Sequence, residues 1–327
     1  MLDAFLATLR PMLTLFLIIA IGFLLRKGNV LSAGSAEVIA KLETWVFCPA
    51  LSFYTMINYC TVSSLKTHAL NVIISLCGVG TAILIGILLS RIFAKENSNE
   101  RGIYCYAFAF ANSGYMGDPI VQALFGDEAL SYYKIFCLPI NILIMTWGLS
   151  LIIPRTKNGS GIKNVVFNPS LLAMIIGVLA GISGLGKYMP DFVMSALDTL
   201  KSCMGPVAML LAGVMIAGYG TRAMLSKKKV YIASLLRLVF IPAFIITLLF
   251  GAKELINLVF RTNIDNGVLH LSFFALAMPL GLNTIVFPAA YGGDSETGAS
   301  MALVSHAMSI ITIPLLYSLM TVIFGHF

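Results

Sequence analysis

The chain has 327 residues, of which 59% are hydrophobic and only 11% are charged, and its formal net charge is +7. A soluble globular protein has roughly a quarter of its residues charged, so this composition excludes an ordinary soluble domain. It predicts an all-α, polytopic membrane protein. The positive charge lies mostly in short loops between apolar stretches, where it suits contact with anionic lipid of the bilayer, and we therefore expect no nucleic-acid partner.

Ten apolar stretches approach or exceed the roughly 20 residues that a helix needs to cross a bilayer. These predicted spans cover residues 4–25, 36–58, 68–93, 101–125, 128–153, 167–185, 191–219, 229–250, 265–291 and 294–324. Residues 1–153, with spans 1 to 5, form one predicted repeat, residues 154–166 form a cytosolic linker, and residues 167–327, with spans 6 to 10, form a second repeat. Because each repeat has an odd number of spans, the two insert in opposite senses as inverted repeats.

The positions of the prolines agree with this duplication. Pro49 in span 2 and Pro206 in span 7 are each expected to kink a helix. Pro49 precedes Pro119 of span 4 by 70 residues, and Pro206 precedes Pro279 of span 9 by 73 residues. The separation between the kinked span and the proline-containing span two spans later is therefore similar in both halves.

Lys and Arg residues are unevenly distributed among the loops. Odd-numbered loops carry twelve of them: Arg26, Lys27, Arg91, Lys95, Arg101, Arg155, Lys157, Lys163, Arg222, Lys227, Lys228 and Lys229. The N-terminal segment and the even-numbered loops carry five: Arg10, Lys66, Lys187, Lys253 and Arg261. The positive-inside rule then predicts that the odd-numbered loops are cytosolic and that both termini lie outside the cytoplasmic (plasma) membrane.

Two of the apolar stretches are interrupted near their middle, at residues 112–119 in span 4 and at residues 278–284 in span 9. Irregular backbone at the membrane midplane is tolerated only where protein or a water-filled cavity satisfies its free N–H and C=O groups. The two interruptions therefore predict one polar substrate site between them, as in transporters. The residues expected to form it are Asn112, Ser113, Gly114, Pro119, Pro279, Asn283 and Thr284.

A helix that resumes after such a break begins with unpaired N–H groups and a partial positive charge, which attract a carboxylate. We expect Asp118 to be the N-cap of the resumed helix in span 4, and Asn283 or Thr284 to be the N-cap in span 9. The amides of Asn112 and Asn283 offer donors to a substrate anion. The alternative is that these amides only satisfy the local backbone.

An Asp at the middle of the membrane costs about 2.5–3.5 kcal/mol on insertion scales, which suggests that Asp118 has a specific role. Two alternatives are open. Asp118 takes up a proton or binds Na⁺ and so couples transport to a gradient, or it is a structural carboxylate at the start of its helix. Elsewhere, Glu43 with Lys41 in span 2 and Asp198 with Lys201 in span 7 are predicted to be ion pairs.

The sequence gives no indication of an enzyme. The six cysteines form no C-x-x-C pair and have no His at metal-ligand spacing, so we expect no metal, no disulfide and no cofactor. Ser305 and His306 are neighbours on a predicted helix and point about 100° apart, so they do not form a nucleophile–base pair. We expect His306 to line the cavity or to bind a neighbouring helix.

The first break carries a resemblance to a known family. The run from Phe110 to Ile120 resembles the N-x-G-(F/Y)-x-G-x-P motif of span 4 in the auxin efflux carrier family. The run from Ala277 to Thr284, followed by Tyr291, Gly292 and Asp294, resembles its span 9. The resemblance extends over essentially the whole chain. It implies the fold of sodium/proton antiporters, in which spans 4 and 9 cross, with a scaffold of spans 1, 2, 6 and 7 and a transport domain of spans 3–5 and 8–10.

The resemblance also implies a function. It predicts a secondary transporter of a small organic carboxylate, either an auxin-like monocarboxylate or a malate-like organic acid, that works by an elevator-like or rocking alternating-access motion. The chain lacks the long hydrophilic loop that plant auxin carriers have between spans 5 and 6, and so is closer to the short bacterial members. H⁺ or Na⁺ is the expected coupling ion, and members of the family often form homodimers. The alternatives are a sodium/proton antiporter and a non-transporting, ligand-binding membrane sensor.

Overall fold

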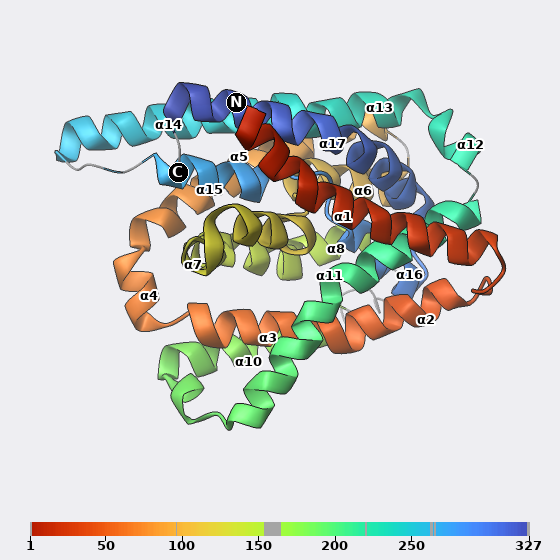
Figure 1. Cartoon of the computed structure of the whole chain (residues 1–327), viewed down its shortest axis with the longest axis horizontal. Helices are drawn as coiled ribbons and strands as arrows, with labels where there is room; N and C mark the ends of the chain where they lie inside the picture. The colour runs from red at the N-terminus through yellow and green to blue at the C-terminus, as the bar shows by residue number, and fades with distance from the viewer. Residues whose placement is uncertain are drawn as a thin grey trace.

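A computed structural model of the chain describes residues 2–95, 97–153, 165–219, 221–261, 264 and 266–325. Within those residues every regular element is a helix (Figure 1). Six helical segments of this part are long and apolar enough to cross a membrane, and two shorter apolar helices accompany them. The predicted all-α, polytopic architecture is therefore confirmed. Of the predicted linker, residues 154–164 lie outside the described residues.

The helices of the first half end shortly before the linker. They are α1 (Leu2–Lys27), α2 (Ser35–Leu42), η1 (Glu43–Phe47), α3 (Cys48–Tyr59), α4 (Val62–Thr67), α5 (Ala69–Phe93), α6 (Ser98–Ala109), η2 (Ser113–Gly117), α7 (Asp118–Leu143), η3 (Ile144–Gly148) and α8 (Leu149–Ile152). Gly126 interrupts the helical conformation inside α7 with a φ of 81°, a value that glycine adopts without strain. The chain therefore turns between the predicted spans 4 and 5.

The helices of the second half are α10 (Pro169–Ser183), η4 (Leu185–Tyr188), α11 (Asp191–Tyr219), α12 (Thr221–Leu225), α13 (Lys228–Leu235), η5 (Leu236–Phe240), α14 (Ile241–Phe260), α15 (Gly267–Leu276), α16 (Asn283–Tyr291) and α17 (Ser295–Phe324). Helix occupies each predicted span, but α14 continues ten residues beyond the predicted end at residue 250. The added part of the helix contains the charged residues Lys253 and Glu254. These two side chains form an ion pair of 2.8 Å, and Lys253 also donates to Asn266 Oδ1 at 2.6 Å, so the helix accommodates them.

Three prolines follow a wide, π-helical turn. Pro49 follows η1, Pro119 follows η2 and Pro242 follows η5, each two residues after the turn ends. The N–H of the residue before each proline donates to a carbonyl five residues earlier instead of four. A π-helical turn changes the hydrogen-bond register just where proline removes an N–H and its ring crowds the preceding turn, so the helix continues past the proline. Pro206 lies inside α11.

Two groups of helices pack together. In one, α11 packs along α1 and against α3, and α3 packs against α10. In the other, α5 contacts α6, α7 and α14, while α13 contacts α17. Figure 1 shows α3 and α10 on one side of the molecule and α13, α14 and α17 on the opposite side, with α7 and α8 between them. The two groups also touch each other through α1 with α17 and through α2 with α16.

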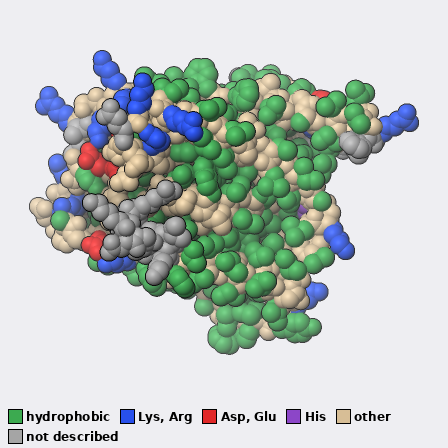
Figure 2. All heavy atoms as spheres, turned by 180° about the vertical axis from the view of Figure 1, so that it is seen from behind, with side chains coloured by type: hydrophobic (Ala, Val, Ile, Leu, Met, Phe, Trp, Pro, Cys, Tyr) green, Lys and Arg blue, Asp and Glu red, His purple; other side chains and the backbone are tan. Residues whose placement is uncertain are grey.

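The outer surface is apolar over a broad band. Figure 2 shows hydrophobic side chains across the middle of one face, with Lys and Arg side chains gathered toward the ends. Leu17, Leu24 and Leu88 are each more than 60% exposed, as side chains that face lipid are. Lys229 Nζ donates to the Phe93 carbonyl at 3.1 Å, which brings two of the Lys/Arg-rich loops together at one end of the molecule.

Candidate functional site

The two predicted interruptions meet in the structure. Residues 110–112 separate α6 from η2, and residues 277–282 separate α15 from α16. Ala111 and Leu280 form an isolated antiparallel bridge, and the Asn112 N–H donates to the Pro279 carbonyl at 2.9 Å. The two unwound segments thus satisfy part of each other's backbone inside the protein, as irregular backbone at membrane depth requires.

The helix resumes earlier after the first break than the sequence suggests. The Asn112 carbonyl accepts from the N–H groups of Met116 and Gly117, both at 3.1 Å, so the helical path begins at Ser113. The prediction that Asp118 is an N-cap is wrong, because Asp118 already has helical φ and ψ angles. The π-helical turn ahead of Pro119 accounts for the difference, since it lets the helix form before the proline.

The second break also lacks the predicted cap. α16 begins at Asn283, and neither its side chain nor that of Thr284 accepts a backbone N–H as a cap. Thr284 Oγ1 instead donates to the Gly281 carbonyl at 3.0 Å. The Thr284 N–H reaches the same carbonyl at 3.2 Å, so a tight turn takes the place of a side-chain cap.

Asn283 joins the two breaks. Its side-chain oxygen accepts from the Tyr115 hydroxyl at 2.8 Å, and its amide nitrogen donates to the Tyr106 hydroxyl at 2.8 Å. All three side chains are buried. Both ends of the amide therefore have partners, and the two tyrosines fix its orientation. The sequence indicated Asn283 but not its tyrosine partners.

Asn112 contacts α17 through its side chain. Its amide nitrogen lies 3.1 Å from His306 Nε2, while His306 Nδ1 lies 2.9 Å from the Ala302 carbonyl. Because a carbonyl only accepts, Nδ1 carries the ring proton, and Nε2 accepts from Asn112. The Asn112 side-chain oxygen is buried and has no hydrogen-bond partner among the described residues. His306 thus binds a neighbouring element, one of its two predicted roles.

A cavity lies beside the two breaks. Its walls come from α3, from the first turn after the first break, from the second half of α7 and from single residues of other elements. The lining residues are Cys48, Leu51, Ser52, Thr55, Met56, Ala111, Ser113, Gly114, Tyr115, Asp118, Lys134, Cys137, Asn141, Ile144, Met145, Met174, Met204, Gly281 and Asn283. The cavity volume is about 50 Å³, which is room for a few water molecules.

The predicted site residues divide into two sets. Ser113, Gly114, Asp118 and Asn283 line the cavity. The others are not among the lining residues: Asn112, Pro119, Pro279 and Thr284. Asn112 and Pro279 hold the two breaks together by their backbone hydrogen bond. Among the described residues, no three His, Cys, Asp or Glu side chains come together as metal ligands.

Lys134 is a cavity residue that the sequence analysis missed. It lies in the second half of α7, and its ammonium forms an ion pair with the Asp118 carboxylate at the start of the same helix. The side chains are 9% and 17% exposed, so the pair is largely shielded from solvent. A lysine in the middle of an apolar span was the available signal, since it is expensive to insert there.

A family model described as Membrane transport protein matches residues 7–163 and 159–317. The chain belongs to this family of transporters. It is the auxin efflux carrier family of the resemblance, so the predicted family is confirmed, and it is not a family of enzymes.

Two relatives are also described as transporters. An uncharacterized transporter of Methanocaldococcus jannaschii is 24% identical over 312 residues, which cover 93% of this chain and 96% of the relative. An uncharacterized transporter of Methanothermobacter thermautotrophicus is 24% identical over 215 residues, which cover 65% of this chain and 69% of the relative. The chain is thus a multi-pass membrane transporter.

Arg237 contributes a second buried cation to the transporter. Its guanidinium donates to the Phe108 carbonyl at 3.3 Å and to the Leu276 carbonyl at 2.7 Å, near the C-terminal ends of α6 and α15. Each helix C-terminus carries a partial charge equivalent to about −0.5, so one guanidinium balances the two ends. No carboxylate pairs with Arg237 in the part of the chain that the structure describes.

The ion pairs predicted for spans 2 and 7 differ in outcome. Lys41 pairs with Glu37 at 2.6 Å, so the predicted pair with Glu43 is wrong. Lys41 and Glu43 are only two positions apart, so they point to different sides of a helix, and the Glu43 carboxyl group is fully buried. The pair of Asp198 with Lys201 is confirmed at 2.6 Å.

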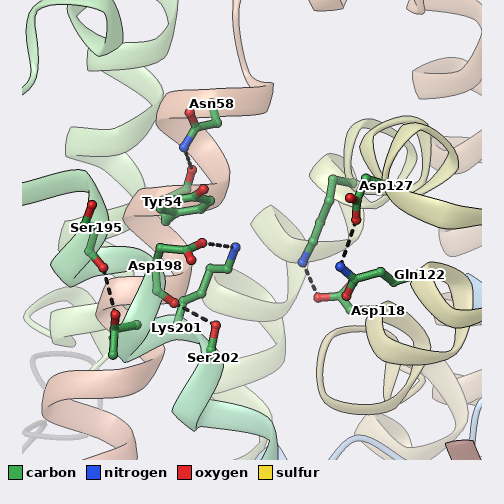
Figure 3. A network of polar contacts seen from close by, with 11 residues as sticks. Tyr54, Asn58, Asp118, Gln122, Asp127, Ser195, Asp198, Lys201 and Ser202 are labelled. Carbon is green, nitrogen blue, oxygen red and sulfur yellow. Dashed lines mark hydrogen bonds and ion pairs between the residues drawn. The ribbon is translucent and has the colours of Figure 1, made fainter. Parts of the chain in front are cut away.

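The Asp198–Lys201 pair belongs to a polar group on α3 and α11. Lys201 Nζ lies 4.0 Å from the centre of the Tyr54 ring. Figure 3 shows Tyr54, Asp198 and Lys201 on one side and Asp118 with Gln122 on the other. Lys201 thus has Asp198 as its own carboxylate, and Asp118 pairs with Lys134.

Proposed function

We propose that this protein is a secondary transporter of a small organic carboxylate, which binds in the cavity beside the two breaks. The observation that carries the proposal is the buried ammonium of Lys134 in that cavity, which the first residues of a resumed helix, Ser113 and Gly114, also line. An ammonium and the start of a helix both favour an anion. Asn283 supplies polar atoms on the opposite break.

Arg237 adds to this preference for anions. Its guanidinium balances the partial negative charges at the C-terminal ends of α6 and α15. Those ends therefore do not cancel the partial positive charges at the starts of η2 and α16. The helix starts at the two breaks thus keep their partial positive charges. Such a site disfavours a transported cation, which argues for organic-anion transport over sodium/proton antiport.

The proposed architecture has ten spans in two inverted repeats, residues 1–153 and 167–327, with broken spans 4 and 9 crossing at the bridge of Ala111 and Leu280. The packing of α1, α3, α10 and α11 supports a scaffold made of spans 1, 2, 6 and 7. The packing of α5, α6, α7, α13, α14 and α17 supports a transport domain made of spans 3–5 and 8–10. Movement of the second group against the first would give elevator-like or rocking alternating access.

The proposal places the protein in the cytoplasmic membrane with both termini outside and residues 154–166 in the cytosol, in keeping with the positive-inside rule. Homodimer formation is part of the same proposal, and native mass spectrometry of the purified protein tests it. A single peak at the monomer mass under conditions that preserve membrane-protein complexes would contradict the dimer.

A thermal-shift experiment tests the substrate class. Purified full-length protein is heated with malate or indole-3-acetate, and in parallel with the uncharged amides of the same acids. Carboxylates that bind the cavity raise Tm, because a ligand at 100 times its Kd stabilises the folded state by about 2.7 kcal/mol. The amides are expected to leave Tm unchanged. Equal shifts with acids and amides, or none across a wider panel of carboxylates, would contradict the proposal.

A further inference from the structure

Asp118 and Lys134 lie on the two sides of the bend in α7 and approach each other. Asp118 stands just after the first break, and Lys134 lies beyond the bend at Gly126. Both side chains line the cavity. A buried ion pair recovers its desolvation cost only when its geometry is good and the remaining donors and acceptors are satisfied, so it is weak evidence for a purely stabilising role.

The ammonium has capacity for another partner. Lys134 has three N–H donors, and Asp118 is its one hydrogen-bonding partner among the described residues. Cys137 and Asn141 follow on the same face of α7 at helical spacing, and both line the cavity. The Lys134 ammonium, with its unused donors, therefore lies at a polar part of the cavity wall.

We propose that Lys134 binds the carboxylate of the substrate, and that Asp118 is an internal counter-ion which the substrate displaces. The inference rests on the proposed function and names the group that recognises the anion. A carboxylate of the substrate offers Lys134 the same two oxygens as Asp118 does, so one can replace the other without leaving the ammonium unpaired. A neutral analogue cannot make this exchange.

The exchange has a consequence for Asp118. Once displaced, it is a carboxylate in the membrane without its cation, because Lys201 on α11 is already engaged with Asp198 and Tyr54. The titratable groups that interact with Asp118 are Lys134, Tyr133 and Cys137 on α7 and Lys201 on α11. The displaced carboxylate then takes up one proton from water and becomes neutral, so each bound carboxylate brings one proton with it.

Calorimetric titration of the purified full-length protein with malate and with indole-3-acetate tests the exchange. Lys134→Gln is expected to weaken binding at least about tenfold, the loss of a hydrogen bond to a charged group. Asp118→Asn is expected to strengthen binding several-fold, because no internal carboxylate competes. The double variant is expected to bind as weakly as Lys134→Gln alone. Lys134→Arg keeps the charge and is expected to retain binding if the glutamine variant does not fold.

Lys253→Gln is the matched control. Like Lys134, Lys253 is a buried lysine that pairs with a carboxylate, in this case Glu254, but it does not line the cavity. Its substitution is expected to leave the affinity unchanged. Repeating the titrations in buffers of different ionisation enthalpy counts protons, with one taken up per ligand by the wild type and none by Asp118→Asn.

The outcomes separate the inference from the proposed function. Equal affinity of wild type and Lys134→Gln, weaker binding by Asp118→Asn, or no proton uptake by the wild type overturns the inference and leaves carboxylate binding intact. Absence of binding to wild type and to Asp118→Asn overturns both. Binding that appears only in Asp118→Asn supports the counter-ion and contradicts carboxylate transport by the natural protein.

Discussion

The hydroxyl group of Tyr115 donates a hydrogen bond of 2.8 Å to the side-chain oxygen of Asn283, although the two residues are 168 positions apart in the chain. Tyr115 belongs to the first turn after one break, and Asn283 is the first residue of the helix after the other. With the backbone bond from Asn112 to Pro279, this contact holds the two breaks in one arrangement. The cavity wall is therefore built from both halves of the chain.

Asn283→Ala is expected to weaken carboxylate binding by about 0.5–3 kcal/mol, the range for a hydrogen bond that involves a charged partner. The substitution removes a polar group from the cavity and leaves the hydroxyls of Tyr106 and Tyr115 without their partner. The Kd for malate or indole-3-acetate measures the effect. Asn58→Ala, an exposed amide on α3, is the control. An unchanged Kd in Asn283→Ala would place the substrate elsewhere.

Arg237→Met is expected to destabilise the protein by roughly 2 kcal/mol or more, because it leaves the carbonyls of Phe108 and Leu276 buried without their donor. The melting temperature of the purified protein in detergent reports the change. Arg91→Met removes an exposed arginine near the end of α5 and is expected to be nearly neutral. If both variants have the melting temperature of the wild type, Arg237 does not hold the helix ends.

Gly117→Ala tests the close packing behind the first break. An added Cβ at position 117 meets the Tyr133 hydroxyl at 2.2 Å, and that hydroxyl donates to the carbonyls of Ser113 and Phe274. A loss of about 1–3 kcal/mol is expected, as for overpacking in a core. Gly251→Ala in α14 meets nothing within 4 Å, so the same substitution there is expected to keep or raise the melting temperature. Equal effects of the two substitutions would contradict the packing argument.

The orientation is tested with two single cysteines in a protein that lacks the native ones. Ser98 at the start of α6 and Ser63 in α4 are both exposed and belong to an odd-numbered and an even-numbered loop. Ser63→Cys is expected to react with an impermeant thiol reagent in intact cells, and Ser98→Cys only after the cells are opened, because the Lys/Arg-rich loops are cytosolic. The reverse pattern would invert the proposed topology.

Local features of the fold were predictable from the sequence. Helix occupies each of the ten predicted spans, and the bounds of α11 coincide with the predicted residues 191–219. The breaks were predictable because Gly, Pro and Asn interrupt apolar runs. The chain turn at Gly126 falls in the predicted gap between spans 4 and 5. All of these depend on residues close together in the chain.

The partners across the site were not predictable in this way. Arg237 binds carbonyls of residues 129 and 39 positions away, and nothing in its own apolar surroundings indicates them. The ring nitrogen that the Asn112 amide contacts belongs to His306, 194 positions later, and the sequence did not identify this partner. The π-helical turns were also missed, and the one ahead of Pro119 accounts for the wrong cap at Asp118.

Transport itself is measured most directly by uptake of radiolabelled malate and indole-3-acetate into proteoliposomes, with and without an imposed pH or Na⁺ gradient. The account predicts that the wild type accumulates a carboxylate when a proton gradient is imposed. Asp118→Asn is expected to exchange labelled for unlabelled carboxylate across the membrane but to lose accumulation driven by the gradient. Accumulation unchanged in Asp118→Asn would leave Asp118 a structural residue. If correctly folded wild type moves no carboxylate under any gradient, the central claim is contradicted, and a ligand-binding sensor or a sodium/proton antiporter becomes the better account.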